Sequence, residues 1–346
     1  MSKFGLVRCS RWVWRFKTLH PQKKASTFFT TTTEGGQAVN ENVSRRPEPP
    51  PIRVALTESA GRGVFATRRI GAGELIHRAK PLVSHPSLSN LQNVCYFCLR
   101  KLGNSVDSQS QGASFCSEEC RKQSKVFHDV EVKADWLAYD EYCRSHGLKY
   151  PLLVKRLSCM VISGAASADL LDILQPAILS PEMISKKEHQ SPAVLLLHGT
   201  MEEGFGLLRS AFTMANIPDA HMEFLTKQWY IEVMSRIRIN AFRIEVAGGL
   251  YGDLLSSAAA SVDAEAAVGN AVYMLPSFYN HDCDPNAHIV WTENVDARLK
   301  ALRDVDAGEE LRICYIDASM NHDARQTLLY QGFGFQCNCP RCLSGD

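Results

Sequence analysis

The sequence predicts an α+β protein in which short β-strands from both ends of the chain enclose a cysteine-rich module and a helical middle part. Three observations predict this class. Short runs of strand-forming residues separated by Gly-rich turns begin near Ile52, apolar residues recur at helical spacing in the middle, and a second set of short strands follows Arg238. At 346 residues, 45% of them hydrophobic, the chain is long enough for a substantial core.

Residues 1–33 form a leader whose composition differs from that of the rest of the chain. The leader is rich in Ser and Thr, and it contains no acidic residue but seven basic ones: Lys3, Arg8, Arg11, Arg15, Lys17, Lys23 and Lys24. This composition is typical of an organellar transit peptide, and a disordered basic tail or a nuclear signal is the alternative. We therefore expect a protein of the mitochondrion or plastid, with the nucleus as the alternative compartment.

The charge of the remaining chain limits the classes of partner. Without the seven leader cations, 31 basic and 37 acidic residues remain, a net charge of −6. Direct nucleic-acid binding is not expected, because it needs clustered Lys and Arg, whereas a mildly acidic body suits a basic peptide substrate. No apolar run approaches the roughly 20 residues that span a bilayer, so no membrane insertion is expected. We expect a monomer.

The order of the elements follows from the pattern along the chain. Residues 34–51 are rich in Gly, Pro and polar residues and are interpreted as a linker. Helical spacing marks residues 131–163 and 201–236, and turn-forming residues separate these segments around 180–192. Strands are predicted at Ile52–Leu56, Gly63–Ala66 and Glu74–Arg78, in a run with Ile239, Ala241 and Ile244, and at Ala287–Trp291, Ala297–Leu302 and Leu311–Tyr315.

The twelve cysteines indicate metal binding in a reducing compartment rather than a disulfide framework. Cys95 and Cys98, together with Cys116 and Cys120, supply the four thiolates of a closed tetrahedral zinc site. A short module with little apolar content needs such a metal to fold. We therefore expect structural zinc here.

A second group of cysteines lies near the C-terminus. Cys337, Cys339 and Cys342 supply three thiolates, one fewer than tetrahedral zinc needs, and Cys283 is the candidate for the fourth. Zinc at this place would pin the tail against the polar loop that precedes Cys283. In the alternative, Cys283 is a small buried apolar residue, and a His or water completes the site. The sequence thus predicts two zinc ions per chain.

The first cysteine module resembles a MYND zinc finger. The resemblance rests on Phe-Cys-Ser-Glu-Glu-Cys at 115–120 and on His128, eight residues after Cys120. Complete MYND fingers hold two zinc ions through interleaved pairs, but this chain lacks the second pair and carries Val132 where the last cysteine would stand. The resemblance therefore implies one retained and one lost zinc site, with His128 as an ordinary surface or packing residue rather than a ligand.

The whole segment from about Pro51 to Cys342 resembles the SET-domain protein lysine methyltransferases. It is similar to the SMYD type, in which a MYND finger interrupts the SET domain, and among these to the short trithorax-related SET proteins of plants. The resemblance implies a β-rich SET fold of knotted short sheets. The implied parts are a targeting leader and linker (1–50), the SET N-terminal part (51–94), a partial MYND-like finger (95–130), a helical insert (131–236), the SET core (237–325) and a zinc-binding post-SET tail (326–346).

The same resemblance implies S-adenosylmethionine as cofactor and assigns the site residues. Tyr315 would be the catalytic tyrosine, and Phe333 would line the lysine channel, where many relatives have a second tyrosine. The plainer alternatives are a core role for Tyr315 and Phe335 and a turn role for the Asn280-His281 pair. The implied cofactor contacts are Arg62, Gly63, Val64, Asn240, Ser277, Phe278, Asn280, His281 and Phe335, the last by stacking on adenine.

The chemistry agrees with these residue types. Methyl transfer from a sulfonium to an amine needs a well-placed, deprotonated amine in a water-poor passage more than it needs acid–base groups. We therefore predict a protein lysine N-methyltransferase that acts on histone, the family default, or on an organellar protein. Because Phe333 lacks a hydroxyl, the number of methyl groups added stays open. The alternative is a catalytically idle adaptor that binds proteins through its zinc finger and an exposed groove.

Overall fold

The computed structural model describes residues 49–102, 113–177, 192–246 and 267–346, with the backbone alone for 192–198. The predicted leader lies outside these residues, and so does most of the loop predicted around 180–192. Within the described ranges, no helix is long and apolar enough to cross a membrane.

The first sheet joins strands from both ends of the chain. Its order is β1 (Ile52–Leu56), β2 (Arg62–Ala66), β10 (Glu310–Ile313) and β7 (Asn280–His281). Strand β10 lies antiparallel to β2 and parallel to β7. This pairing brings the glycine turn (Gly61-Arg62-Gly63) at the start of β2 next to the polar loop that contains β7. Arg62 and Asn280 are 218 residues apart in sequence.

Two three-stranded sheets complete the β-structure of the described residues. One has the order β3 (Leu75–Ala79), β9 (Ala297–Ala301) and β8 (Ala287–Val290). The other has the order β4 (Val83–Pro86), β6 (Gly269–Val272) and β5 (Ala241–Ile244). All pairs in these two sheets are antiparallel. Each sheet therefore combines strands from before and after the helical middle part.

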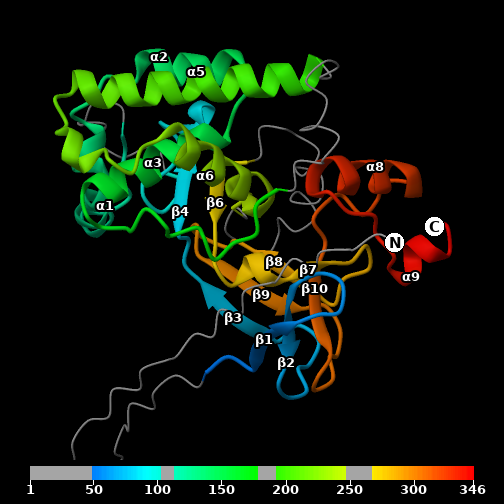
Figure 1. The fold of residues 1–346 in the computed structure, drawn as a ribbon. Coiled ribbons are helices and arrows are strands. Elements are labelled where there is room, and N and C mark those ends of the chain that lie inside the picture. The colour runs from blue at the N-terminus through cyan, green and yellow to red at the C-terminus, as the bar shows by residue number, and fades with distance from the viewer. Residues whose placement is uncertain (1–48, 103–112, 178–191, 247–266) are drawn as a thin grey trace, which may run out of the picture. The chain divides into compact units, whose positions relative to one another are not determined.

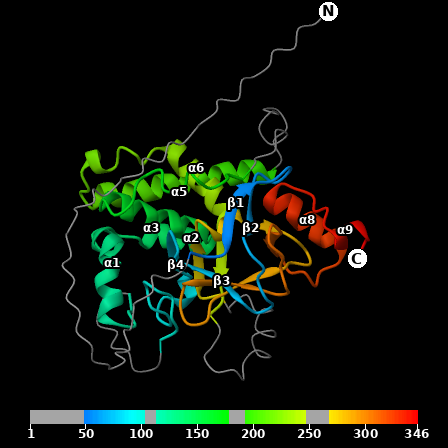
Figure 2. The ribbon, with the colours of Figure 1, turned by 90° about the horizontal axis from the view of Figure 1, so that it is seen from below.

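The helices form two groups. Helices α1 (Glu118–Glu131), α2 (Leu137–Ser145), α3 (Tyr150–Ile162), α5 (Pro192–Met214) and α6 (Lys227–Asn240) gather beside β4 and β6 (Figure 1). Helices α8 (His322–Phe333) and α9 (Pro340–Leu343) lie together on the side away from α1 in both views (Figures 1 and 2). Single 3₁₀ turns occur at Leu88–Asn90, Asp219–His221 and Pro276–Phe278.

The apolar residues form separate clusters that match this division. One large cluster packs the helices and the first cysteine module together, and another fills the space between the sheets. A small third cluster contains Leu329 of α8 and the C-terminal cysteines. The tail is therefore held by its own contacts with α8 and by Cys283, rather than by either large core.

A buried arginine anchors the first cysteine module. Arg156 donates to the main-chain oxygens of Ser84 (2.7 Å) and Tyr96 (3.0 Å) and pairs with Glu131 at 3.3 Å. Its guanidinium also lies 4.0 Å from the centre of the Phe127 ring. Since Arg156 belongs to α3 and Ser84 to β4, these contacts fix the module, helix and sheet to one another.

The predicted fold class is confirmed, and several element boundaries differ from the predicted ones, two of them next to predicted site residues. Helix α6 continues to Asn240, whereas a strand was predicted around Ile239. Its buried residues are Tyr230, Val233, Ile237 and Asn240, which recur with helical spacing. Strand β10 ends at Ile313, two residues before the predicted end at Tyr315. Its last hydrogen bond to the neighbouring chain segment is the one that the Asp282 amide donates to the Ile313 main-chain oxygen.

Candidate active site and metal centres

The structure brings together the four cysteines of the first predicted metal site. Their Sγ atoms all lie within 4.8 Å of one another, and the cysteines form no disulfide. Cys116 Sγ lies 3.5 Å from the Sγ atoms of both Cys98 and Cys120. Tetrahedral zinc with four sulfur ligands at about 2.3 Å has sulfur–sulfur edges of about 3.8 Å. The set can therefore hold one zinc ion, and His128 instead packs against the Tyr96 and Phe115 rings.

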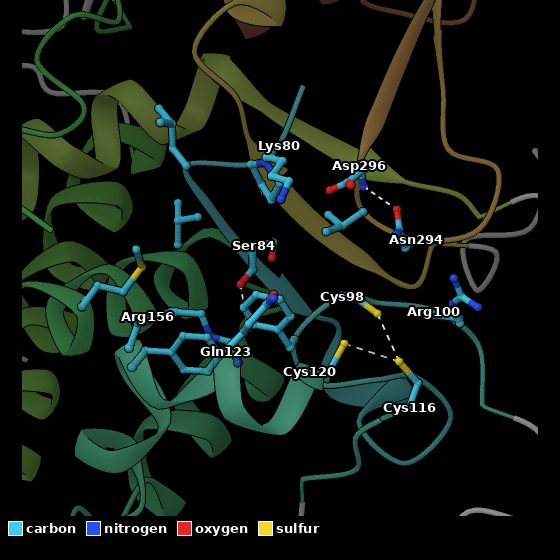
Figure 3. Close-up of a pocket in the computed structure, with 18 of the residues that line it drawn as sticks. Lys80, Ser84, Cys98, Arg100, Cys116, Cys120, Gln123, Arg156, Asn294 and Asp296 are labelled. Atoms are coloured by element: carbon cyan, nitrogen blue, oxygen red, sulfur yellow. Dashed lines mark hydrogen bonds between the residues drawn. The ribbon is translucent and has the colours of Figure 1, made fainter. Parts of the chain in front are cut away.

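A cavity of about 450 Å³ lies beside this first cluster. Figure 3 shows Cys98, Cys116 and Cys120 on one side of it, with Lys80 and Asp296 among the polar residues opposite. None of its lining residues is a predicted cofactor or catalytic residue. The cavity therefore lies between the zinc module, residues 80–84 and residues 294–296, apart from the predicted methyl-transfer site.

The second metal site is also assembled, with Cys283 as the fourth member. The Sγ atoms of Cys283, Cys337, Cys339 and Cys342 lie within 4.8 Å of one another, and all four residues are buried. Cys283 Sγ lies 3.5 Å from Cys342 Sγ and 4.0 Å from Cys337 Sγ. A buried set of four sulfur donors matches closed structural zinc sites. Two zinc ions per chain therefore fit the described cysteines.

The His281 side chain connects this metal site to Tyr315. Its Nδ1 accepts a hydrogen bond from the Tyr315 amide at 3.1 Å, and its Nε2 lies 3.3 Å from Cys283 Sγ. A ring that accepts at Nδ1 and donates at Nε2 is neutral, and burial lowers the pKa of His281 to about 4. One imidazole thus joins the polar loop, the backbone of the predicted catalytic residue and a metal ligand.

Aromatic side chains surround the Tyr315 ring. The Phe333 ring centre lies 5.0 Å from that of Tyr315, and the Phe335 ring centre lies 6.4 Å away. The Tyr315 hydroxyl donates to the Tyr279 main-chain oxygen at 2.6 Å. Burial raises the pKa of Tyr315, so its hydroxyl stays protonated at neutral pH. The partly buried Tyr315 hydroxyl and the Tyr279 carbonyl oxygen are thus bordered by the Phe333, Phe335 and His281 rings, which together form what we call the aromatic enclosure.

The glycine turn and the polar loop meet as predicted. Asn280 Nδ2 donates to the Arg62 main-chain oxygen at 3.1 Å and to Glu310 Oε1 at 2.7 Å. The Arg62 guanidinium lies 4.4 Å from the centre of the Phe278 ring. Val64 has no exposed surface and pairs with strands on both sides, so the structure does not leave this predicted contact open to a ligand.

Two further predicted contacts use their polar atoms within the protein. Asn240 Nδ2 donates to the main-chain oxygens of Gln175 (2.9 Å) and Arg236 (2.7 Å). The Ser277 hydroxyl donates to the Tyr273 main-chain oxygen at 2.6 Å. Arg62 also donates to the main chain just before Gln175, at Ile173. The segment after α3 therefore adjoins the predicted cofactor site, and no residue pattern in that segment indicated it.

The SET domain family matches residues 61–316 of this chain. The chain belongs to the SET-domain family. As in the SMYD type, the SET domain is interrupted, here by the first cysteine module and the helices that follow.

Several relatives extend the match beyond the SET domain itself. The chain is 59% identical to Histone-lysine N-methyltransferase ATXR4 of Arabidopsis thaliana, over 100% of both chains. It is 28% identical to Histone-lysine N-methyltransferase SMYD3 of Homo sapiens, over 86% of this chain and 63% of that protein. It is 24% identical to Histone-lysine N-methyltransferase ASHR2 of Arabidopsis thaliana, over 84% of this chain and 71% of that protein. The predicted resemblance is confirmed.

Gly63 of the SET domain cannot carry a side chain without displacing its neighbours. A Cβ atom there would lie 2.5 Å from Glu310 Oε1 and 3.2 Å from Asn280 Nδ2. We expect Gly63→Ala to weaken S-adenosylmethionine binding about tenfold or more, since it displaces two groups that shape the turn. Calorimetric titration measures this, with Gly71→Ala as control because its nearest atom would be 3.9 Å away. Equal affinities of both variants would contradict the expectation.

A buried histidine of the SET domain supports the carbonyl that Tyr315 contacts. His77 Nδ1 lies 3.3 Å from the Arg78 main-chain oxygen, so Nε2 accepts from the Tyr279 hydroxyl at 3.0 Å. Tyr279 is fully buried, and an unpaired hydroxyl there costs about 1–3 kcal/mol. We expect His77→Phe to lower kcat about tenfold or more, because the Tyr279 main chain shifts relative to Tyr315.

Steady-state kinetics with stability measurements test the role of His77. His77→Gln retains an acceptor and should recover most of the lost turnover. His85→Phe is the matched control, since buried His85 lies 3.4 Å from the Tyr96 hydroxyl in the zinc module. It should lose stability but keep kcat. A kcat equal to that of wild type in His77→Phe would refute the expectation.

Proposed function

We propose that this protein transfers methyl groups from S-adenosylmethionine to the side-chain amine of lysine in a protein substrate. The observation that carries the proposal is the enclosed Tyr315 hydroxyl, which lies against the Tyr279 carbonyl and next to Phe333. The glycine turn and the polar loop of the SET domain adjoin this enclosure. The relative with 59% identity is named a histone-lysine N-methyltransferase, which supports the same reaction.

The residues of the site fit the cofactor that this family uses. S-adenosylmethionine supplies an electrophilic methyl group on a sulfonium. Asn240 Nδ2 is engaged by two main-chain oxygens, so its Oδ1 would accept from the cofactor's ammonium group. Phe335, 6.0 Å from His281 between ring centres, would stack on adenine. The main chain of the glycine turn would contact the other parts of S-adenosylmethionine.

The chain's own groups position the reaction rather than supply acid or base. The lysine enters as a free amine, its nitrogen forms a bond to the methyl carbon, and the carbon–sulfur bond breaks with its electrons remaining on sulfur. The Tyr315 hydroxyl and the Phe333 ring orient the amine and exclude water. The Tyr279 carbonyl is an acceptor of the kind that forms weak C–H hydrogen bonds with a polarised methyl group.

Transfer of labelled methyl groups tests the proposal directly. Full-length protein with labelled S-adenosylmethionine should label histones or proteins of an organellar extract, and acid hydrolysis should recover the label as methyllysine. Absence of labelling together with absence of cofactor binding by calorimetry would instead favour the adaptor.

The substrate and its compartment are the finer part of the proposal. A net charge of −6 outside the leader suits a basic peptide substrate such as a histone tail. The enzyme would act as a monomer and would not contact nucleic acid directly. The acid-free leader favours a mitochondrial or plastid location, where the substrate would be another basic protein. A fluorescent fusion with and without residues 1–45 tests the location, and an unchanged nuclear signal in both would reject the organelle.

A further inference from the structure

A fully buried arginine lies beside the C-terminal cysteine cluster. Arg325 belongs to α8 and has no exposed surface. Its Nη2 lies 3.8 Å from Cys342 Sγ, and its Nη1 donates to the Met320 main-chain oxygen at 2.6 Å. Nη2 also donates to the main-chain oxygen of Asp346. The guanidinium therefore faces the cluster from the α8 side.

The partners of Arg325 differ from those of the other fully buried arginine. Arg156 pairs with the Glu131 carboxylate at 3.3 Å. In the part of the chain that the structure describes, Arg325 contacts two main-chain oxygens, of Met320 and Asp346, and two sulfurs, of Cys342 and Cys283. Its Nε is buried without a hydrogen-bond partner. A buried cation without an opposite charge is strongly unfavourable. The thiolates of the cysteine cluster can supply this charge, and the Asp346 oxygen that Arg325 also contacts is the alternative.

A zinc ion with four thiolates carries a net charge of −2, which also needs stabilisation when it is buried. Two side chains approach these sulfurs as donors. His281 Nε2 lies 3.3 Å from Cys283 Sγ, but this ring is neutral because its Nδ1 accepts from an amide. Arg325 supplies a full positive charge, at Cys342 and Cys283. The buried positive charge of Arg325 and the buried negative charge of a zinc tetrathiolate would therefore lower each other's cost of burial.

The neighbouring residue on α8 also holds the tail. Gln326 Nε2 donates to the Cys337 main-chain oxygen at 2.8 Å, and its Oε1 accepts from the Cys337 amide at 3.0 Å. Helix α8 ends at Phe333, which lies against Tyr315. The helix that lines the predicted lysine channel thus presents two consecutive residues to the metal-bearing tail.

We propose that Arg325 is the counter-charge of the Cys283–Cys337–Cys339–Cys342 metal centre, and that its charge retains zinc in this centre. Groups that contact metal ligands commonly change metal affinity 10–100-fold when they are replaced. Removing the charge leaves the thiolates with the neutral His281 as donor, so this zinc should dissociate faster. The inference concerns metal retention and does not depend on methyl transfer.

Zinc transfer from the purified full-length protein to a chromophoric chelator tests this role. We expect Arg325→Gln to release one of two zinc ions at least tenfold faster than wild type. The Cys95–Cys98–Cys116–Cys120 centre should release its zinc at the wild-type rate, which gives an internal reference. Arg325→Lys retains the charge and should stay within about threefold of wild type. Release of both ions at wild-type rates in Arg325→Gln overturns the proposal.

Further variants separate charge from shape and from tail docking. Arg341→Gln removes a tail arginine that pairs with Asp346 at 3.1 Å, and it should retain both zinc ions. A variant without residues 344–346 should do the same, and fast release from it would assign the counter-charge to the Asp346 oxygen instead. If Arg325→Gln does not fold, Arg325→Lys decides. Zinc retention then supports the proposal, and fast release overturns it.

Discussion

Replacing Tyr315 by phenylalanine is expected to lower methyl transfer about 100-fold or more while cofactor affinity stays within about threefold of wild type. The hydroxyl is the polar side-chain group that the structure places inside the aromatic enclosure, where it donates to the Tyr279 carbonyl at 2.6 Å. Removing one preorganised donor of this kind costs about 10²–10³ in kcat in other enzymes. The ring and its packing against Phe333 remain, so the fold should be preserved.

Single-turnover labelling at saturating cofactor measures this loss, and calorimetry measures the affinity. Tyr330→Phe is the matched control, because Tyr330 lies on α8 with 56% of its surface exposed. It should transfer methyl groups at the wild-type rate. Equal turnover in Tyr315→Phe and wild type would remove the hydroxyl from the mechanism, even if the protein remains a methyltransferase.

The cysteine spacing predicted both metal centres because thiolate ligands must lie close together. All four cysteines of the first centre belong to two close pairs, and three of the four in the second are near neighbours in sequence. Cys283 could be assigned as well, since a three-cysteine tail lacks one ligand. The motifs at the glycine turn and the polar loop were equally informative. They are short, and their residue types are tied to one chemistry.

Other parts of the site carry no such local signal. Helix α8 was not predicted, and with it the contacts of Arg325 and Gln326 to the tail were missed. A buried arginine looks like any surface arginine in a sequence, and only its environment distinguishes it. His77 and Tyr279 meet across 202 residues, so their hydrogen bond depends on how β3 and the polar loop are placed.

The boundary between α6 and β5 shows a related limit. Apolar residues near Ile239 fit a strand as well as a helix. The prediction assigned Ile239 to the strand, but the strand begins only at Ala241. Tertiary burial of Ile237 and Asn240 on one helical face decided the matter. Pairing of β10 with both β2 and β7 likewise follows from the global topology: β2 and β10 were predicted as strands, whereas the residues of β7 were predicted as part of a polar loop.

Cys283→Ser is expected to reduce the zinc content from two ions to one and to weaken S-adenosylmethionine binding about 10–100-fold. Cys283 is not a predicted cofactor contact, so the effect must pass through its neighbours. His281 Nε2 would lose the sulfur at 3.3 Å that fixes its orientation, and the same ring accepts from the Tyr315 amide. The tail that carries Phe335 would also lose one of its attachments to the polar loop.

Metal analysis combined with calorimetric titration measures both quantities in one preparation. Cys314→Ser is the matched control: it is the same substitution next to Tyr315, but Cys314 donates to the Ile316 main-chain oxygen and lies outside the metal cluster. It should keep two zinc ions and the wild-type affinity. A Cys283→Ser protein that loses one zinc but binds the cofactor as tightly as wild type would show that the metal-bound tail stabilises the fold without affecting cofactor binding. A joint loss would show that metal binding and cofactor binding are coupled, through the His281 ring, which contacts both Cys283 and the Tyr315 amide, or through the tail that carries Phe335.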